Sequence, residues 1–132
     1  MNVFDLIHDL QWLRAKRAMV PLDHGEAARL AQLDHMVSPK GEEEPTLIRM
    51  LRPCPCLLAL PGRGFIGAKL RVMSGDGFVL TTDEKIAEGD RVIVHVDSEG
   101  SSYAFPCRVS DTNHGLTVTL EGVPTRQADN AA

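Results

Sequence analysis

The chain has 132 residues, a formal net charge of −4 and an isoelectric point near 5.7. This length accommodates one domain with a hydrophobic core and a small appendage, but it is short for two full domains. The acidic balance argues against non-specific nucleic-acid binding, which requires a basic surface.

The sequence predicts a cytoplasmic protein. Charged side chains interrupt the apolar residues of the first twenty positions, and no run approaches eighteen apolar residues, so neither a signal peptide nor a membrane span is expected. The cysteines at 54, 56 and 107 are odd in number, and the first two are too close in sequence to pair readily. This pattern favours reduced thiols in a reducing compartment.

The N-terminal region, residues 1–38, predicts a hairpin of two amphipathic helices. Over residues 3–20 apolar side chains recur three and four positions apart, and Pro21 ends this first helix. Asp23 and Glu26 form a capping-box pattern at the start of the second helix, which ends before a Ser-Pro pair. The two apolar stripes must be covered by each other, by the rest of the chain or by a partner.

After a charged linker, residues 39–45, the periodicity changes to short β runs. Runs of this kind, separated by turns and without long helices between them, describe a small antiparallel barrel or sandwich over residues 46–126. Residues 127–132 are predicted to be a frayed tail. The expected strands are 46–51, 56–60, 65–73, 78–82, 91–96, 103–110 and 116–123.

Alternation within these strands predicts the core. Valines at 92, 94 and 96 share one face of a strand. Phe65, Phe78, Tyr103 and Phe105 alternate with aliphatic residues and are therefore predicted to be core residues.

Residues 74–77, Ser-Gly-Asp-Gly, join two short apolar runs, and the predicted sheet extends outward from this pair of strands. Glycine adopts positive φ without a steric clash, and serine and aspartate bond nearby backbone N–H groups, so this segment predicts a tight hairpin turn. Two glycines beside a serine also allow a ligand to approach the backbone closely.

Four segments follow one another in a characteristic order and spacing: 72–82, 86–94, 103–109 and 115–124. In this order they resemble the PilZ domain, a β-barrel known for binding the bacterial second messenger cyclic di-GMP. The resemblance covers residues 49–124. It implies a mainly β fold, a small six-stranded antiparallel PilZ-like barrel preceded by the N-terminal helical hairpin.

The resemblance also implies a residual ligand site. The family carries an Arg-x-x-x-Arg run before the first barrel strand and an Asp/Asn-x-Ser-x-x-Gly run in the hairpin. Arg52 matches the second arginine of the first motif, with Arg49 out of step by one residue, and Ser74 and Gly77 match the second motif. These four residues are the candidate ligand-binding residues.

Two motif positions are lost, because Ile48 stands at the first arginine and Val72 at the acidic or amide position. A missing guanidinium removes charge-assisted hydrogen bonds and a stacking surface, and valine cannot bond a guanine edge. At ~1.5–3 kcal/mol per charge-assisted bond, these losses would weaken a micromolar ligand by roughly two to four decades.

The sequence therefore predicts a non-enzymatic regulatory or scaffolding protein with weak or no cyclic di-GMP binding. It would act through protein–protein contacts of the helical hairpin or the barrel surface, in bacterial motility, polarity or signalling, with homo-oligomerisation left open. The alternative is a true cyclic di-GMP receptor that uses Arg49, Arg52, Ser74 and Gly77.

A second alternative is a small metal-dependent or serine hydrolase. The segment 54–56, Cys-Pro-Cys, with His95 or His114 suggests a metal site, and Ser74, Asp76 and His114 suggest a nucleophile system. The cysteine spacing is shorter than zinc sites use, and the serine lacks a Gly-x-Ser-x-Gly setting. We therefore predict no catalytic residue, no metal ligand and no cofactor.

Overall fold

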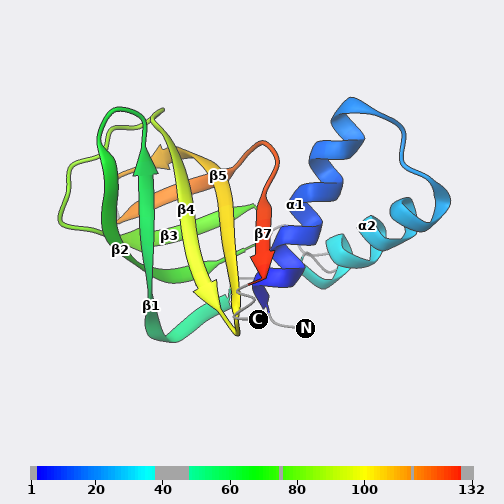
Figure 1. The fold of residues 1–132 in the computed structure, drawn as a ribbon, viewed down its shortest axis with the longest axis horizontal. Coiled ribbons are helices and arrows are strands. Elements are labelled where there is room, and N and C mark those ends of the chain that lie inside the picture. The colour runs from blue at the N-terminus through cyan, green and yellow to red at the C-terminus, as the bar shows by residue number, and fades with distance from the viewer. Residues whose placement is uncertain (1–2, 38–47, 75, 114, 129–132) are drawn as a thin grey trace.

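The computed structural model describes residues 3–37, 48–74, 76–113 and 115–128. Within these ranges the chain forms two helices followed by seven strands (Figure 1). No helix in the described ranges is long and apolar enough to cross a bilayer. The predicted linker, 39–45, lies outside the described residues. The elements are α1 (Val3–Met19), α2 (His24–Val37), β1 (Ile48–Leu60), β2 (Gly64–Met73), β3 (Gly77–Thr81), β4 (Arg91–Ser98), β5 (Ser101–Asp111), β6 (Leu116–Leu120) and β7 (Thr125–Ala128).

The helical hairpin forms as its sequence predicts. The capping box is confirmed, because the Glu26 backbone N–H donates to Asp23 Oδ1 at 2.7 Å and the Asp23 N–H donates to Glu26 Oε1 at 3.2 Å. Arg29 in α2 also pairs with Asp9 in α1 at 3.5 Å. The capping box begins α2, and the Arg29–Asp9 pair joins it to α1.

The strands close into a barrel. Neighbours pair in the order β1, β2, β3, β6, β5 and β4, and β4 pairs again with β1, with every ladder antiparallel. The predicted six-stranded antiparallel barrel is thus confirmed. β7 is an additional strand that pairs with the first half of β5. Because it reaches Ala128, β7 takes up two residues of the predicted tail, of which 129–132 lie outside the described residues.

β1 differs from the prediction of two strands, 46–51 and 56–60, separated by prolines. It is one strand whose register against β2 shifts between Arg49 and Cys54. The irregularity accommodates Pro53, since a proline can lie at a bulge without interrupting a ladder. Pro55 pairs with Lys69 of β2, while the ladder to β4 runs over 57–59. The strand therefore continues through both prolines.

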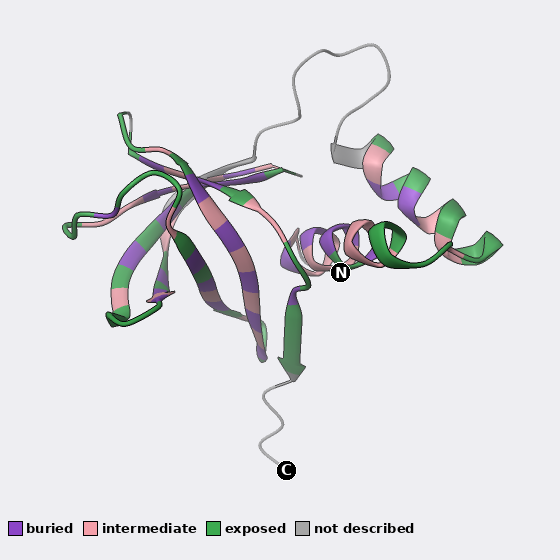
Figure 2. Cartoon of the chain, turned by 90° about the horizontal axis from the view of Figure 1, so that it is seen from above, coloured by how far each residue is buried: buried purple, intermediate pink, exposed green. Residues whose placement is uncertain are grey.

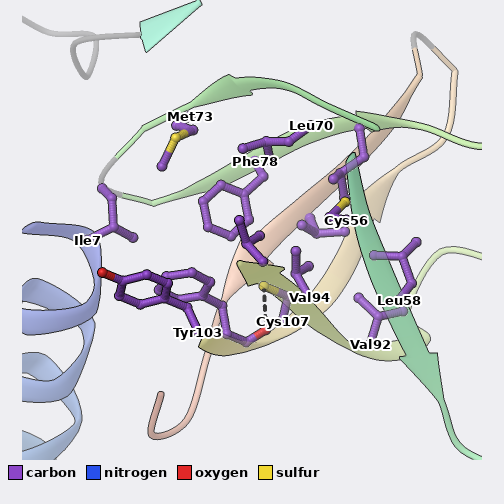
Figure 3. Close-up of a cluster of buried hydrophobic side chains, with 14 of the residues drawn as sticks. Ile7, Cys56, Leu58, Leu70, Met73, Phe78, Val92, Val94, Tyr103 and Cys107 are labelled. Atoms are coloured by element: carbon purple, nitrogen blue, oxygen red, sulfur yellow. Dashed lines mark hydrogen bonds between the residues drawn. The ribbon is translucent and has the colours of Figure 1, made fainter. Parts of the chain in front are cut away.

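The core is continuous from the barrel into the helices. Figure 2 shows buried residues alternating with half-buried and exposed ones along the barrel strands. Phe78, Tyr103 and Phe105 are buried as predicted, and Ile7 of α1 lies beside Tyr103 (Figure 3). The prediction was wrong for Phe65, which is 67% exposed.

Candidate functional site

The β2–β3 turn is the predicted tight hairpin, and its serine hydroxyl is used to build it. The Ser74 backbone N–H donates to the Gly77 carbonyl at 2.9 Å. Ser74 Oγ accepts the N–H groups of Asp76 and Gly77, both at 3.2 Å, and lies 3.4 Å from the Gly77 carbonyl oxygen. A hydroxyl has one donor and two acceptor positions. All three therefore have partners inside the turn.

Gly77 is required for a different reason from the one the sequence suggested. It is not among the described glycines with positive φ. It pairs with Thr119 of β6, and a Cβ at this position would lie 1.9 Å from the Val118 carbonyl oxygen. Glycine here lets β3 approach β6, so its match to a ligand motif has a structural explanation.

Helix α1 reaches the same turn. Arg14 donates to Asp76 Oδ1 at 3.3 Å and to Asp34 Oδ1 of α2 at 2.6 Å. The Asp76 carbonyl also accepts the Leu120 N–H at 2.7 Å. The turn is thus held both by the chain at the end of β6 and by the helical hairpin.

A buried glutamine joins α1 to the neighbouring strands. Gln11 is 4% exposed, and its Nε2 donates to the carbonyl oxygens of Pro106, Glu121 and Gly122 at 3.1–3.3 Å. Its Oε1 is the buried side-chain oxygen that has no hydrogen-bond partner among the described residues. One amide therefore supplies a buried polar contact between α1 and the barrel.

The N-terminal end of α1 is held by a second polar cluster. The Tyr103 hydroxyl donates to Asp5 Oδ1 at 2.7 Å, and Arg126 of β7 pairs with the same carboxylate at 3.2 Å. The Arg126 guanidinium also lies 5.9 Å from the centre of the Tyr103 ring. β7 therefore helps to fasten the helix to β5.

Two depressions flank the turn. One, of about 160 Å³, lies on the outer barrel surface between β2, β3 and β6 and is lined by Val72, Ser74 and Gly77 among others. The other, of about 310 Å³, lies between α1 and β6, with Gln11, Arg14 and Asp76 in its wall. Ligand pockets for drug-sized molecules occupy roughly 300–1,000 Å³. The depression at the predicted motif is smaller than this range.

The two candidate arginines are in β1. Arg49 pairs with Val72 of β2. Val72 precedes Ser74 by two residues, so the backbone of Arg49 lies close to the start of the turn. Arg52 lies in the segment where the β1–β2 register shifts. The side chains of both arginines lie outside the described part of the structure. The backbone thus brings Arg49 and Ser74 to the same end of the hairpin.

The residues of the hydrolase alternative are separated. Cys56 is buried, whereas His95 lies on the outer face of the barrel with its ring 5.5 Å from that of Phe65. Burial raises the pKa of the Cys56 thiol to about 12, with a further contribution from Cys54, and burial also raises the pKa of Cys107. His114 lies outside the described residues, among which no cluster of three metal-ligating side chains occurs.

No protein-family model and no curated protein matches this chain. What the structure defines is therefore a class of fold: a closed six-stranded antiparallel barrel with an additional strand, preceded by a two-helix hairpin.

Sequence reasoning missed the contacts of Gln11 and Arg14. Gln11 stands in the apolar stripe of the first helix, between Leu10 and Leu13 on the buried side. A polar residue at a core position usually has a hydrogen-bond partner, so the sequence contained a signal. The partners of Gln11 lie 95–111 residues away, and nothing local identifies them.

Proposed function

We propose that this chain is a non-enzymatic regulatory or scaffolding protein, in which a PilZ-like barrel acts through protein contacts. In this proposal the barrel binds cyclic di-GMP weakly or not at all, and the setting is bacterial motility, polarity or signalling. The observation that carries the proposal is that the turn matching the ligand motif uses its own groups to hold itself and α1 in place.

The local chemistry supports a lost ligand site. The Ser74 hydroxyl is occupied within the turn, and the Asp76 carboxylate is paired with Arg14. Val72 lines the depression where an acidic or amide side chain would be needed. A dinucleotide would have to replace these contacts, and each replaced hydrogen bond reduces the net gain from binding.

The same occupied hydroxyl supports the absence of a serine nucleophile. A nucleophilic serine needs a base within hydrogen-bond reach. The described partners of Ser74 Oγ are backbone groups of Asp76 and Gly77.

Protein contacts are supported by where apolar surface remains exposed. The helical stripes are covered, because Phe4, Ile7 and Leu10 of α1 and Leu30 and Leu33 of α2 all belong to the continuous core. Among the barrel strands, large exposed apolar residues lie on β1, β2 and β4, at Leu57, Phe65 and Ile93. Trp12, Met19 and Val20 of the helical hairpin are exposed as well, so both the barrel surface and the hairpin are available to a partner, and on the barrel the exposed residues lie on neighbouring strands.

Calorimetry with cyclic di-GMP tests the proposal. The full chain should give no binding heat at tens of micromolar ligand. A low-micromolar isotherm with one ligand or one ligand dimer per chain would overturn it.

The second candidate is a true cyclic di-GMP receptor, favoured by the pairing of Arg49 with Val72 that brings β1 to the turn. If this candidate is right, the wild-type chain binds, and Arg52→Ala abolishes binding. Arg63→Ala is the matched control, because Arg63 lies in the β1–β2 turn at the other end of β2 and donates to the Lys85 carbonyl.

A further inference from the structure

An apolar face spans four strands on the outside of the barrel. The ladders place Phe65, Ala59, Ile93 and Pro106 side by side across β2, β1, β4 and β5. The next outward row along the strands pairs Leu57 with His95. We call these six residues the β4 face.

The β4 face is exposed. Phe65 is 67% exposed, Leu57 49% and Ile93 39%. The His95 ring meets the Phe65 ring edge-on, with the ring centres 5.5 Å apart. Scattered apolar residues are ordinary on protein surfaces, but neighbouring ones on adjacent strands form a contiguous patch of the kind that marks an interaction site.

Charges border this face in a self-complementary way. The outward residues of β4 are, in order, Arg91, Ile93, His95 and Asp97. The strand thus carries a cation at one end, an anion at the other and an apolar centre. Arg91 is 74% exposed at its side chain, although it pairs with Glu121 at 3.9 Å. The Asp97 carboxylate accepts a hydrogen bond from Ser102 at 2.6 Å.

Two copies of such a face can be related by a two-fold axis that lies in the interface. If the axis is parallel to β4, Arg91 meets Arg91 of the other copy. If the axis is perpendicular to β4, the two strands run antiparallel across the interface and Arg91 meets the other copy's Asp97. Opposite charges favour the second arrangement, and face-to-face sheets commonly pack with nearly aligned strands.

We propose that a second copy of this chain docks on the β4 face. The two β4 strands run antiparallel across a two-fold axis, with Ile93 and Phe65 at the centre and reciprocal Arg91–Asp97 pairs at the rim. The face is remote from the Ser74 turn, because Phe65 lies at the start of β2 and the turn follows its end. This inference deepens the proposed function by naming the partner of the barrel surface, and it rests on that proposal for the view that this surface serves binding.

The area sets the expected strength. Four strands about 4.8 Å apart and six residue steps of about 3.3 Å from Arg91 to Asp97 give a face of about 15 by 20 Å. Stable dimers bury about 800 Å² of accessible surface per partner. The β4 face covers only about 300 Å² by these dimensions. The dimer should therefore be weak and should dissociate on dilution through the micromolar range.

Sedimentation velocity of the full chain between about 5 and 500 μM tests the inference. The wild-type chain should shift from monomer to dimer over this range, and Ile93→Glu should weaken the dimer at least tenfold. Met19→Ser is the matched control, because Met19 is 77% exposed but lies at the end of α1. It should leave the dissociation constant within twofold of the wild-type value.

A charge exchange tests the arrangement itself. Arg91→Asp and Asp97→Arg should each weaken the dimer several-fold, because each places like charges opposite one another. The double variant should return the dissociation constant to within about threefold of wild type. A double variant that stays as weak as the single variants would contradict the antiparallel two-fold arrangement.

A chain that stays monomeric to 500 μM would overturn the inference and leave the face to a different partner. An Ile93→Glu variant that dimerises as well as wild type would also overturn it. These failures differ from failure of the proposed function. A chain that stays monomeric and gives no heat with cyclic di-GMP would contradict only the dimer inference. A chain that dimerises and binds the dinucleotide at low micromolar concentration would contradict only the proposal that the ligand site is lost.

Discussion

Arg14 in α1 donates a hydrogen bond to Asp76 in the β2–β3 turn, 62 residues later in the chain, at 3.3 Å. The same guanidinium bonds Asp34 of α2 at 2.6 Å. One side chain therefore connects both helices to the β2–β3 hairpin of the barrel. This contact occupies the carboxylate of Asp76, the residue that precedes Gly77 of the candidate site.

Arg14→Ala should lower the free energy of unfolding by about 1 kcal/mol, because partly exposed ion pairs contribute roughly 0.2–1 kcal/mol each. Urea denaturation measures the loss. Arg17→Ala, which changes an exposed arginine one turn further along α1, is the control and should cost a few tenths at most. The difference between the two variants should shrink in 1 M salt, where exposed charges are screened. A difference that is independent of salt would contradict an ionic contact.

Gly77→Ala should be the most damaging single-methyl change in the turn. Its Cβ would lie 1.9 Å from the backbone oxygen of Val118, so β3 and β6 would have to separate. We expect a loss of about 3 kcal/mol, the upper part of the range for overpacking. Gly25→Ala is the matched control in α2, where a Cβ meets no atom closer than 3.5 Å. Equal stabilities of the two variants would refute the close-approach explanation.

Gln11→Met tests the amide that seats α1. The change keeps the length of the side chain but leaves three carbonyl oxygens without this donor, at a cost of about 1–3 kcal/mol in urea denaturation. Gln11→Glu should cost more at neutral pH, because it turns a carboxylate toward those oxygens. Gln32→Met, on the exposed side of α2, should change stability little. A Gln11→Met chain as stable as wild type would show that the amide contributes nothing.

The buried thiols predict a loss of stability in alkaline solution. Burial raises the pKa of Cys56 to about 12 and raises that of Cys107 as well, while an unfolded thiol titrates near about 8.5. The unfolded chain therefore loses these protons first. The free energy of unfolding is therefore unaffected by these thiols' ionisation below about pH 8.5. It falls as the pH rises toward the pKa values of the thiols in the folded chain, by at most about 1.4 kcal/mol per pH unit for each thiol.

Urea denaturation from pH 7.5 to 10.5 under reducing conditions measures this slope. The Cys56→Ala and Cys107→Ala variants should start less stable, because each leaves a small cavity, but their stability should fall less steeply. Parallel curves for wild type and variants would contradict the thiol contribution.

The local elements followed from the sequence because their causes are local. The capping box of α2, the alternation of β4 and the Ser74 turn each depend on residues within a few positions of one another. Phe65 was misassigned although a local signal existed, since it alternates in step with the exposed Lys69 and Arg71 of β2. The charged residues of this face indicate that it points to solvent.

The parts of the candidate site that the sequence did not predict depend on contacts between distant segments. The length of β1 is set by its ladders to β2 and β4, which outweigh the two prolines. The role of Gly77 is set by Val118, and that of Arg14 by Asp76. Periodicity predicts which face of an element a residue lies on. The contacts of that face depend on how the barrel closes and where the helices pack.

The central proposal is that the barrel has lost its dinucleotide site. The most direct measurement is calorimetry with cyclic di-GMP on the wild-type chain beside an Ile48→Arg, Val72→Asp double variant that restores both lost motif positions. The proposal predicts no measurable heat from the wild-type chain at tens of micromolar ligand and a gain of binding in the double variant. A low-micromolar isotherm from the wild-type chain would contradict it.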